Sequence, residues 1–394
     1  MGLKEWLDKI AEEAKQGLSI PSPYGVDIDL HEYIGGAGGY KLDFDSIGRV
    51  GVDLGAKALY LQVDQAYFKY ISRIPGVEVY RLEDFIENNP DEAKEYVWRL
   101  IKPSTDKYVA IAALKGMGGY FIRVKKNTKV EDPIMACLFI SSRGLQAPHN
   151  VVIVEDGAEA TVYTGCAIAP EAIGLHIGLS EFYVGRNAKL RFVMVHSWNR
   201  VAHVRPRTVV DVSENGEYVS YYANLSNAKT LQSYPKVYLA SNAHAYLASI
   251  VLGVGESDID IGSAAFLEDD ESGVEIVSRT IARDSSKIVM RASIVGRGGR
   301  GHIDCRGLML SNKSLITTIP ELHAMSSNAI LTHEASIGKI AEDEIHYLMS
   351  KGFTRDEAIG ILVRGFISID IKGIPDKIKS YIETIEKLTT EKAM

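Results

Sequence analysis

Turn-forming residue pairs recur along the middle of the chain at a nearly constant spacing. The second members of these pairs stand at positions 158, 188, 216, 243 and 273, so the successive steps are 30, 28, 27 and 30. A period in this range is typical of architectures in which similar units stack on one another. The pairs are Gly157-Ala158, Asn187-Ala188, Asn215-Gly216, Asn242-Ala243 and Ser272-Gly273. The repeat favours a β-solenoid, and a large β-sandwich or a propeller stays open as an alternative.

The segments between these turns have the pattern of β-strands. In residues 189–195, Leu190, Phe192 and Met194 fall on one side, and Lys189 and Arg191 fall on the other. This alternation is the period of a strand. The chain also holds 35 glycines in 394 residues, which suits many tight turns. We therefore expect mainly β structure from about residue 108 to about residue 335.

The N-terminal part shows mixed α and β patterns. Apolar residues at helical spacing predict an amphipathic helix over residues 1–20. Two strands are expected at 58–63 and 77–80. A helical stretch follows over 82–100, and Asn89-Pro90 in its middle indicates two helices in place of one.

The C-terminal part returns to helical patterns. We expect helices over residues 340–350, 354–364 and 375–388, and Thr354 with Glu357 forms a capping-box signature for the second. The predicted organisation is a mixed α/β region over 1–105, a β core over 106–336 and a helical region over 337–394.

Composition excludes several classes of function. Lys and Arg number 44 against 51 Asp and Glu, a net charge of −7, which disfavours nucleic-acid binding. No apolar run is long enough for a membrane span, and no signal peptide is evident, so we expect a cytoplasmic protein. The three cysteines form no C-x-x-C pair, which argues against a disulfide framework or a zinc motif.

Cys305, His333 and Glu334 are the strongest candidates for metal chemistry. Thiolate, imidazole and carboxylate all ligate iron. The separation between Cys305 and His333 is about one repeat step, so the two are expected to face each other on adjacent coils. The alternative is that Cys305 packs as a small apolar residue and that His333-Glu334 is a surface pair.

Four further residues are candidates for a reactive thiol or for a place in the interior. Cys166 follows a strand pattern and adjoins Gly165, which favours an accessible thiol, although an inert core cysteine is the commoner case. Cys137 lies in an apolar strand and is interpreted as a packing residue. His196 and Trp198 alternate onto one strand face and are expected to line the interior, with a structural aromatic pair as the alternative.

Several stretches resemble the SufB/SufD family, the scaffold proteins of the SUF iron–sulfur cluster assembly system. The most specific is 331–352, which begins Leu331-Thr332-His333-Glu334-Ala335 and is similar to the family's "HEA…KI.EDQLFYL.SRG" signature. Residues 108–133 are similar to a second family segment. Thr164-Gly165-Cys166, followed by 175–181, is similar to a third. The resemblance implies a right-handed parallel β-helix flanked by helical regions.

The resemblance also implies roles for the candidate residues. Cys305, His333 and Glu334 would hold iron and sulfide of a transient nascent cluster at a subunit interface. Cys166 would accept persulfide sulfur from a donor protein, and His196 and Trp198 would line an internal tunnel. His196 stands where the family places a glutamine. The resemblance leaves the need for a flavin open.

Partners are implied in the same way. The C-terminal helices would dock the ABC-type ATPase SufC, and the chain would pair with itself or with a SufB/SufD paralogue as a dimer. The chain has SufD-like length but the SufB-like His-Glu-Ala motif, so it is interpreted as a hybrid scaffold without catalytic turnover of its own. A carbohydrate-active β-helix enzyme and a purely structural β-solenoid are the alternatives.

Overall fold

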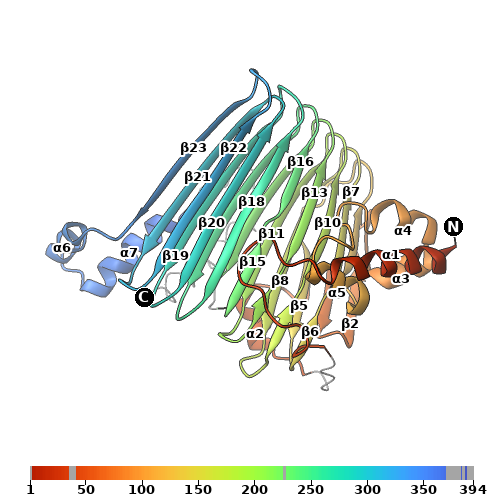
Figure 1. The fold of residues 1–394 in the computed structure, drawn as a ribbon, viewed down its shortest axis with the longest axis horizontal. Helices are drawn as coiled ribbons and strands as arrows, with labels where there is room; N and C mark the ends of the chain where they lie inside the picture. Colours follow the sequence, from red (N-terminus) through yellow and green to blue (C-terminus); the bar gives the residue numbers. More distant parts are fainter. Residues whose placement is uncertain (1, 35–40, 225–227, 370–382, 384–386, 388–394) are drawn as a thin grey trace.

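Two long sheets face each other and form the walls of a parallel β-solenoid of about eight turns (Figure 1). A computed structural model of the chain describes residues 2–34, 41–224, 228–369, 383 and 387. The predicted mainly β, solenoidal class is confirmed, with an N-terminal α/β region and C-terminal helices, and the sandwich and propeller alternatives fall away.

Sheet A, as we name the first wall, has the order β2-β1-β5-β8-β11-β14-β17-β19-β21-β23. Its strands pair in parallel except for β1 with β2. Their bounds are β1 Ala58–Val63, β2 Tyr67–Ser72, β5 Ile134–Ile140, β8 Glu159–Ile168, β11 Lys189–Ser197, β14 Glu217–Asn224, β17 His244–Gly253, β19 Gly273–Ala282, β21 Arg300–Met309 and β23 Ile330–Gly338.

Sheet B, the second wall, starts with the antiparallel pair β3 and β4 and continues in parallel. Several of its turns hold two short strands where others hold one long strand. Its strands are β3 Val77–Arg81, β4 Tyr120–Val124, β6 Gly144–Gln146, β7 His149–Val154, β9 Gly174–His176, β10 Leu179–Val184, β12 His203–Val204, β13 Arg207–Val212, β15 Thr230–Ser233, β16 Lys236–Leu239, β18 Asp258–Leu267, β20 Lys287–Gly296 and β22 Leu315–Ala324.

The sequence repeat corresponds to one turn of the solenoid. Lys189 pairs in register with Glu159 on one side and Glu217 on the other, and each of these residues follows a predicted turn. Gly157 and the asparagines at 187, 215 and 242 have φ values between 52° and 71°. Glycine and asparagine tolerate this left-handed conformation better than other residues, which explains why they mark the corners.

The main apolar core lies between the two sheets, and a second apolar cluster covers the outer face of sheet A. The second cluster includes Ile47 from α2 (Phe44–Arg49), Phe139 from β5, and Val363 and Ile367 from the C-terminal helix α7. Strands buried on both faces are apolar at nearly every position, as β5 shows.

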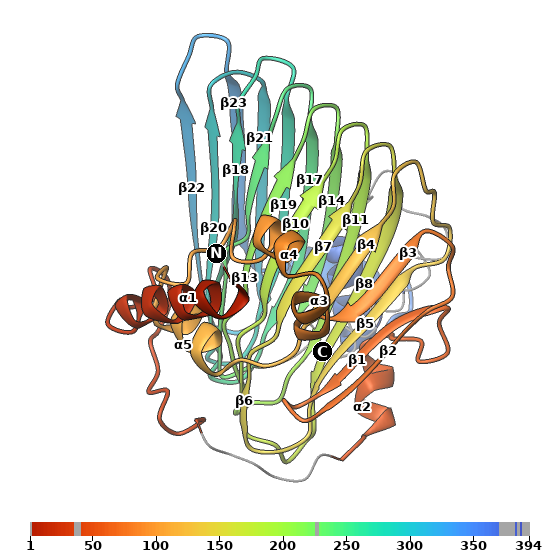
Figure 2. The same cartoon turned by 90° about the vertical axis from the view of Figure 1, so that its right-hand side faces the viewer.

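Four N-terminal helices lie beside sheet B (Figure 2). The predicted amphipathic helix is α1 (Leu3–Gly17), and the break at Asn89-Pro90 separates α3 (Leu82–Asn88) from α4 (Pro90–Tyr96) as expected. The expectation of β structure from about residue 108 is wrong at its start. Residues 107–115 form helix α5 (Lys107–Lys115), because the buried Asp106 side chain accepts hydrogen bonds from the backbone N–H groups of Tyr108 and Val109 and caps it.

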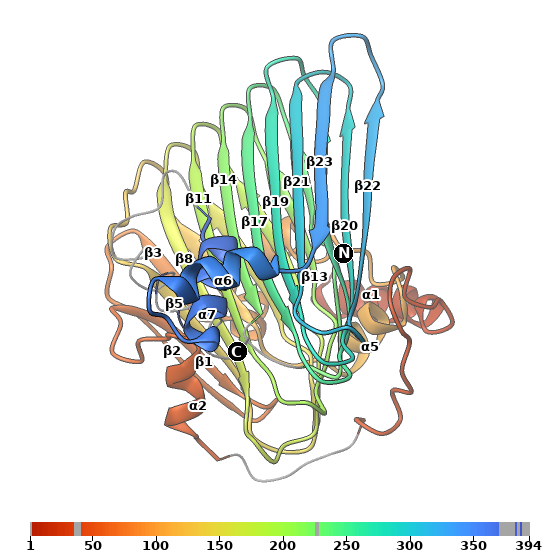
Figure 3. The ribbon, with the colours of Figure 1, turned by 90° about the vertical axis from the view of Figure 1, so that its left-hand side faces the viewer.

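Two helices follow the last strand and lie at the side of the solenoid (Figure 3). They are α6 (Glu342–Ser350) and α7 (Arg355–Ile367), and the capping box of Thr354 and Glu357 is present. The third predicted helix, over 375–388, lies outside the described residues apart from 383 and 387. In the part of the chain that the structure covers, no helix has both the length and the apolar character of a membrane span.

Candidate functional site

Cys305 lies in the middle of β21 and points into the solenoid. It pairs in register with Ser278 on β19 and with Ala335 on β23, and only 1% of its surface is exposed. Burial raises the pKa of its thiol to about 11, and the nearby Thr318 hydroxyl on β22 partly opposes this rise. At neutral pH the thiol is therefore protonated.

His333 and Glu334 lie on β23, the last strand of sheet A, and both are exposed. His333 pairs with Ile303, so the expectation that it stacks directly on Cys305 is wrong by two residues. The cause is the length of this coil, which runs from Cys305 to its partner Ala335 and therefore extends past His333. Since residues two apart share a strand face, Cys305 and His333 still lie diagonally on the same face. Glu334 lies on the opposite face, paired with Asp304.

Cys166 lies within β8 and is fully buried. The expectation of an accessible thiol beyond the end of a strand is therefore wrong, because the strand continues to Ile168. Burial, with a smaller contribution from Cys137, raises the pKa of Cys166 well above its ordinary value. In register, Cys166 pairs with His196 on the next strand.

His196 and Trp198 both lie in the interior, with ring centroids 5.1 Å apart. His176 from β9 joins them, 5.0 Å from the Trp198 ring. Burial, aided by His176, holds the pKa of His196 well below its usual range, so its imidazole is neutral. Nδ1 of His196 is 3.0 Å from the Tyr222 hydroxyl, while Nε2 is buried without a hydrogen-bond partner among the described residues.

Polar side chains from successive strands of sheet A connect the two inward-facing cysteines. His196 shares a hydrogen bond with the Tyr222 hydroxyl, and Tyr222 pairs in register with Ser249. The hydroxyl oxygens of Ser249 and Ser278 are 2.6 Å apart, and Ser278 pairs with Cys305. We call this set the polar seam: Cys166, His196, Tyr222, Ser249, Ser278 and Cys305. It crosses five strand spacings, roughly 24 Å.

The sequence interpretation missed three members of the polar seam, although a signal for them exists. Tyr222, Ser249, Ser278 and Cys305 follow one another at the spacing of the solenoid repeat. A search of the sequence for polar residues that recur at inward positions of successive coils would have found these three residues. Cys137, in contrast, faces the outer apolar cluster, where burial raises the pKa of its thiol to about 12. It lies in an apolar strand, as expected.

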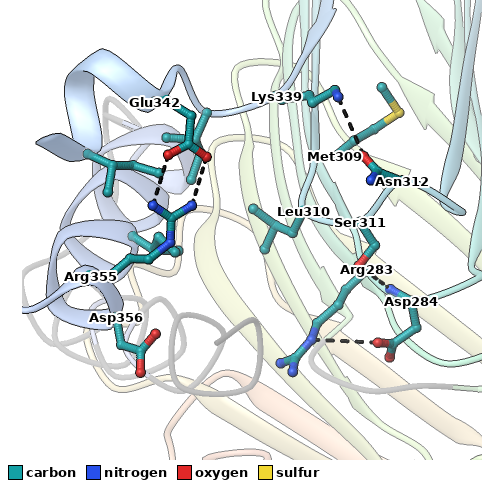
Figure 4. A pocket seen from close by; sticks show the side chains of 13 residues that line it. Arg283, Asp284, Met309, Leu310, Ser311, Asn312, Lys339, Glu342, Arg355 and Asp356 are labelled. Carbon is teal, nitrogen blue, oxygen red and sulfur yellow. Dashed lines mark hydrogen bonds and ion pairs between the residues drawn. The ribbon is translucent and has the colours of Figure 1, made fainter.

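A groove of about 500 Å³ separates α6 and α7 from the turns of the solenoid (Figure 4). On the helical side, Arg355 makes two hydrogen bonds to the Glu342 carboxylate, at 2.7 and 2.8 Å. On the solenoid side, Arg283 lies 3.8 Å from Asp284. Apolar residues, including Leu310 and Ile359, complete the lining. The groove therefore combines apolar side chains with charges of both signs.

The described residues of one chain bring together no complete metal site. Across the described residues, no three His, Cys, Asp or Glu side chains gather closely enough to hold a metal ion. Cys305 and His333 are near neighbours on one face, but Glu334 is on the other. Any cluster held here would need further ligands.

Comparison with known proteins identifies the family. A family model described as "SUF system FeS cluster assembly, SufBD core domain" matches residues 138–366. An "Iron-sulfur cluster assembly SufBD family protein" of Archaeoglobus fulgidus is 42% identical over 361 residues, which cover 90% of this chain and 97% of the relative. A protein of the same description from Methanothermobacter thermautotrophicus is 37% identical, covering 95% of this chain and 96% of that relative. The chain therefore belongs to the SufBD family.

Proposed function

We propose that the chain is a cytoplasmic scaffold for the assembly of nascent iron–sulfur clusters and has no catalytic turnover of its own. The observation that carries the proposal is the polar seam, which runs between two buried thiols on the inner face of sheet A. Burying a polar group costs free energy unless it is hydrogen bonded, so a row of polar side chains at inward positions of successive coils favours a role beyond packing. Membership of the SufBD family supports an assembly role over the carbohydrate-active and purely structural alternatives.

In this proposal Cys166 accepts sulfur from the persulfide of a donor protein when the fold around β8 opens locally, because the thiol is fully buried in the closed solenoid. The Cys166 sulfur attacks the outer sulfur of the persulfide, one S–S bond forms as another breaks, and the donor leaves as a thiol. No oxidant is needed, since the sulfane sulfur only changes its partner. His196, Trp198 and the hydroxyls of the seam line the path by which sulfur then reaches Cys305.

Cys305, His333 and Glu334 are proposed to hold the cluster together with a second subunit. The last coil supports this role, because β22 and β23 are largely exposed and carry the apolar side chains Leu315 and Ile330, which are 53% and 55% exposed. Open strand edges with apolar residues favour association. A second copy of this chain, or a paralogue, would supply the missing ligands, and crosslinking with mass measurement that finds only a monomer would contradict this arrangement.

The helical region is proposed to dock the SufC ATPase. The mixed apolar and charged groove of Figure 4 supports this assignment. So do Tyr347 and Phe353, which are 62% and 41% exposed at α6 and just beyond it. A pull-down with SufC in which Tyr347→Ala binds as well as the wild type would count against this surface.

Anaerobic reconstitution with iron and sulfide tests the scaffold function. We expect visible cluster absorption in the wild type and a marked loss in Cys305→Ala and His333→Ala. Cys137→Ala is the matched control, because it removes a thiol that faces the outer cluster and should retain the signal. Equal absorption in all four proteins would refute the proposed ligands and favour a structural solenoid.

A further inference from the structure

The wall of sheet B is interrupted on four adjacent turns, and the last two of these interruptions adjoin the cavities described below. Strand β12 ends at Val204 and β13 begins at Arg207, while β15 ends at Ser233 and β16 begins at Lys236. Pro206 and Pro235 lie in these interruptions. Since proline has no N–H group, the ladder loses one donor at each place, while the N–H groups of Arg205 and Arg207 still donate to the preceding turn.

Cavities lie on both sides of this interruption. The inner cavity, of about 50 Å³, lies between the sheets and is lined in part by Tyr222 and Ser249 of the polar seam. The outer pocket, of about 250 Å³, opens on the other side and is lined in part by Arg207. Thr208 and Ser233 line both. Their side chains therefore form the partition between the outer pocket and the polar seam.

The inner cavity is a real hollow in the core. Ser220, Tyr222 and Ser249 occupy inward positions of sheet A, yet all three are only half-buried because they face this space. One water molecule needs roughly 10–15 Å³ measured in this way, so the cavity holds a few small molecules. The hydroxyl groups in its lining can form hydrogen bonds with a ligand, and the lining includes no carboxylate.

The chemistry of the outer pocket favours a small anion over a metal cation. Arg207 is paired with the buried Asp106 carboxylate at 2.8 Å, and Lys236 stands exposed beside it. The rings of Tyr24 and Tyr234, 4.6 Å apart, form part of the wall. The Asp106 carboxylate also lines the pocket, but it is already bonded to Arg207 and to the backbone N–H groups of Tyr108 and Val109. Ferrous iron prefers imidazole, thiolate or carboxylate ligands, whereas the other polar groups of the lining are cations, hydroxyls and the Gln232 amide. Hydrosulfide or inorganic polysulfide is small enough and carries the matching charge.

We propose that Thr208 and Ser233 form a side entrance through which small inorganic sulfur anions reach the polar seam. The choice of ligand rests on the proposed function, but the entrance itself rests on the two adjoining cavities. Sulfur would enter at the level of Tyr222 and Ser249, between Cys166 and Cys305, without help from a donor protein.

The entrance can be tested with iron-free protein and inorganic disulfide as the probe. A cysteine thiol takes one sulfur atom from HSS⁻, forms a persulfide and releases HS⁻. The rate is followed at each cysteine by mass spectrometry of tagged peptides. Thr208→Phe, which fills the partition, should slow persulfide formation at Cys166 about ten-fold, equivalent to a barrier higher by about 1.4 kcal/mol. Thr208→Val, of matched shape, should not slow it.

Cys137 is the internal control, because it faces the outer cluster on the opposite side of sheet A. An unchanged rate at Cys166 in Thr208→Phe would overturn the proposal, and so would an equal slowing at Cys137, since that would indicate a general change in stability. If Thr208→Phe fails to fold, Thr208→Ala with Ser233→Ala should speed the reaction at Cys166. Because no iron is present, the outcome is independent of whether a cluster can be assembled.

Discussion

The first and last turns of the solenoid share one pairing scheme but differ in burial. All seven residues of β5 are buried, whereas no residue of β23 is. Both strands pair in parallel with a neighbour in sheet A. The difference is coverage, since β1 and the outer apolar cluster cover β5, while β23 ends the sheet. The same strand pairing therefore does not by itself bury a strand. His333 and Glu334 lie on the exposed strand β23.

The largest expected effect comes from truncating a side chain on the covered turn. Phe139 on β5 is fully buried in the outer cluster, so Phe139→Ala should lower the free energy of unfolding by about 3–5 kcal/mol. Ile337→Ala on β23, where the side chain is 38% exposed, should cost about 1 kcal/mol or less. Urea unfolding of both variants measures these two changes. Similar losses of unfolding free energy in Phe139→Ala and Ile337→Ala would contradict the difference between the two turns.

A pH series should reveal the buried His176 in the interior of the solenoid. Burial lowers the pKa of His176 to about 3, against about 6.5 in the unfolded chain. Between these values the unfolded state binds the extra proton, so stability is lost as pH falls. From pH 7 to pH 5 we expect a loss of about 2 kcal/mol from this residue.

Urea unfolding at the two pH values checks this expectation. His176→Gln should show a shallower pH dependence than the wild type, whatever its stability at pH 7. Ile337→Ala is the control, because it changes a partly exposed side chain without removing a titratable group. An identical slope in all three proteins would mean that His176 does not carry the effect.

The smallest effect concerns the capping box of α7. Thr354→Ala removes the hydroxyl that accepts a hydrogen bond from the backbone N–H of Glu357, at a cost of about 1 kcal/mol. Amide hydrogen exchange in α7 should accelerate about five-fold, while exchange in β5 stays unchanged. Thr354→Ser, which keeps the hydroxyl, should behave as the wild type. Acceleration in β5 as well would show that the helix and the first turns unfold together.

The sequence predicted correctly those turns and helix ends that depend only on residues close together in the chain. The turn residues Asn187 and Asn215, the proline break at Asn89-Pro90 and the Thr354 cap each act through their own backbone, and the structure has them where they were expected. Helix α5 was missed because Tyr108, Val109 and Ile111 are strand formers, although the cap at Asp106 was visible in the sequence.

The candidate site was harder to predict, because its geometry depends on coil length. The coil that starts at Cys305 closes at its partner Ala335, so His333 falls two residues short of direct stacking. The polar seam and the two cavities arise from contacts between successive coils and between the two sheets. Only the assembled fold makes these contacts apparent.

The two ends of the solenoid also limit how many copies can join. At the N-terminal end, the edge strands β2 and β3 have six and five residues and run antiparallel to their neighbours, and β2 carries Lys69. Short, charged edges resist pairing. A head-to-tail contact would therefore match a long open edge with a short protected one, and a fibre would not grow. In the proposed dimer, association through β22 and β23 would be self-limiting, because a two-fold contact would use the open end of both copies.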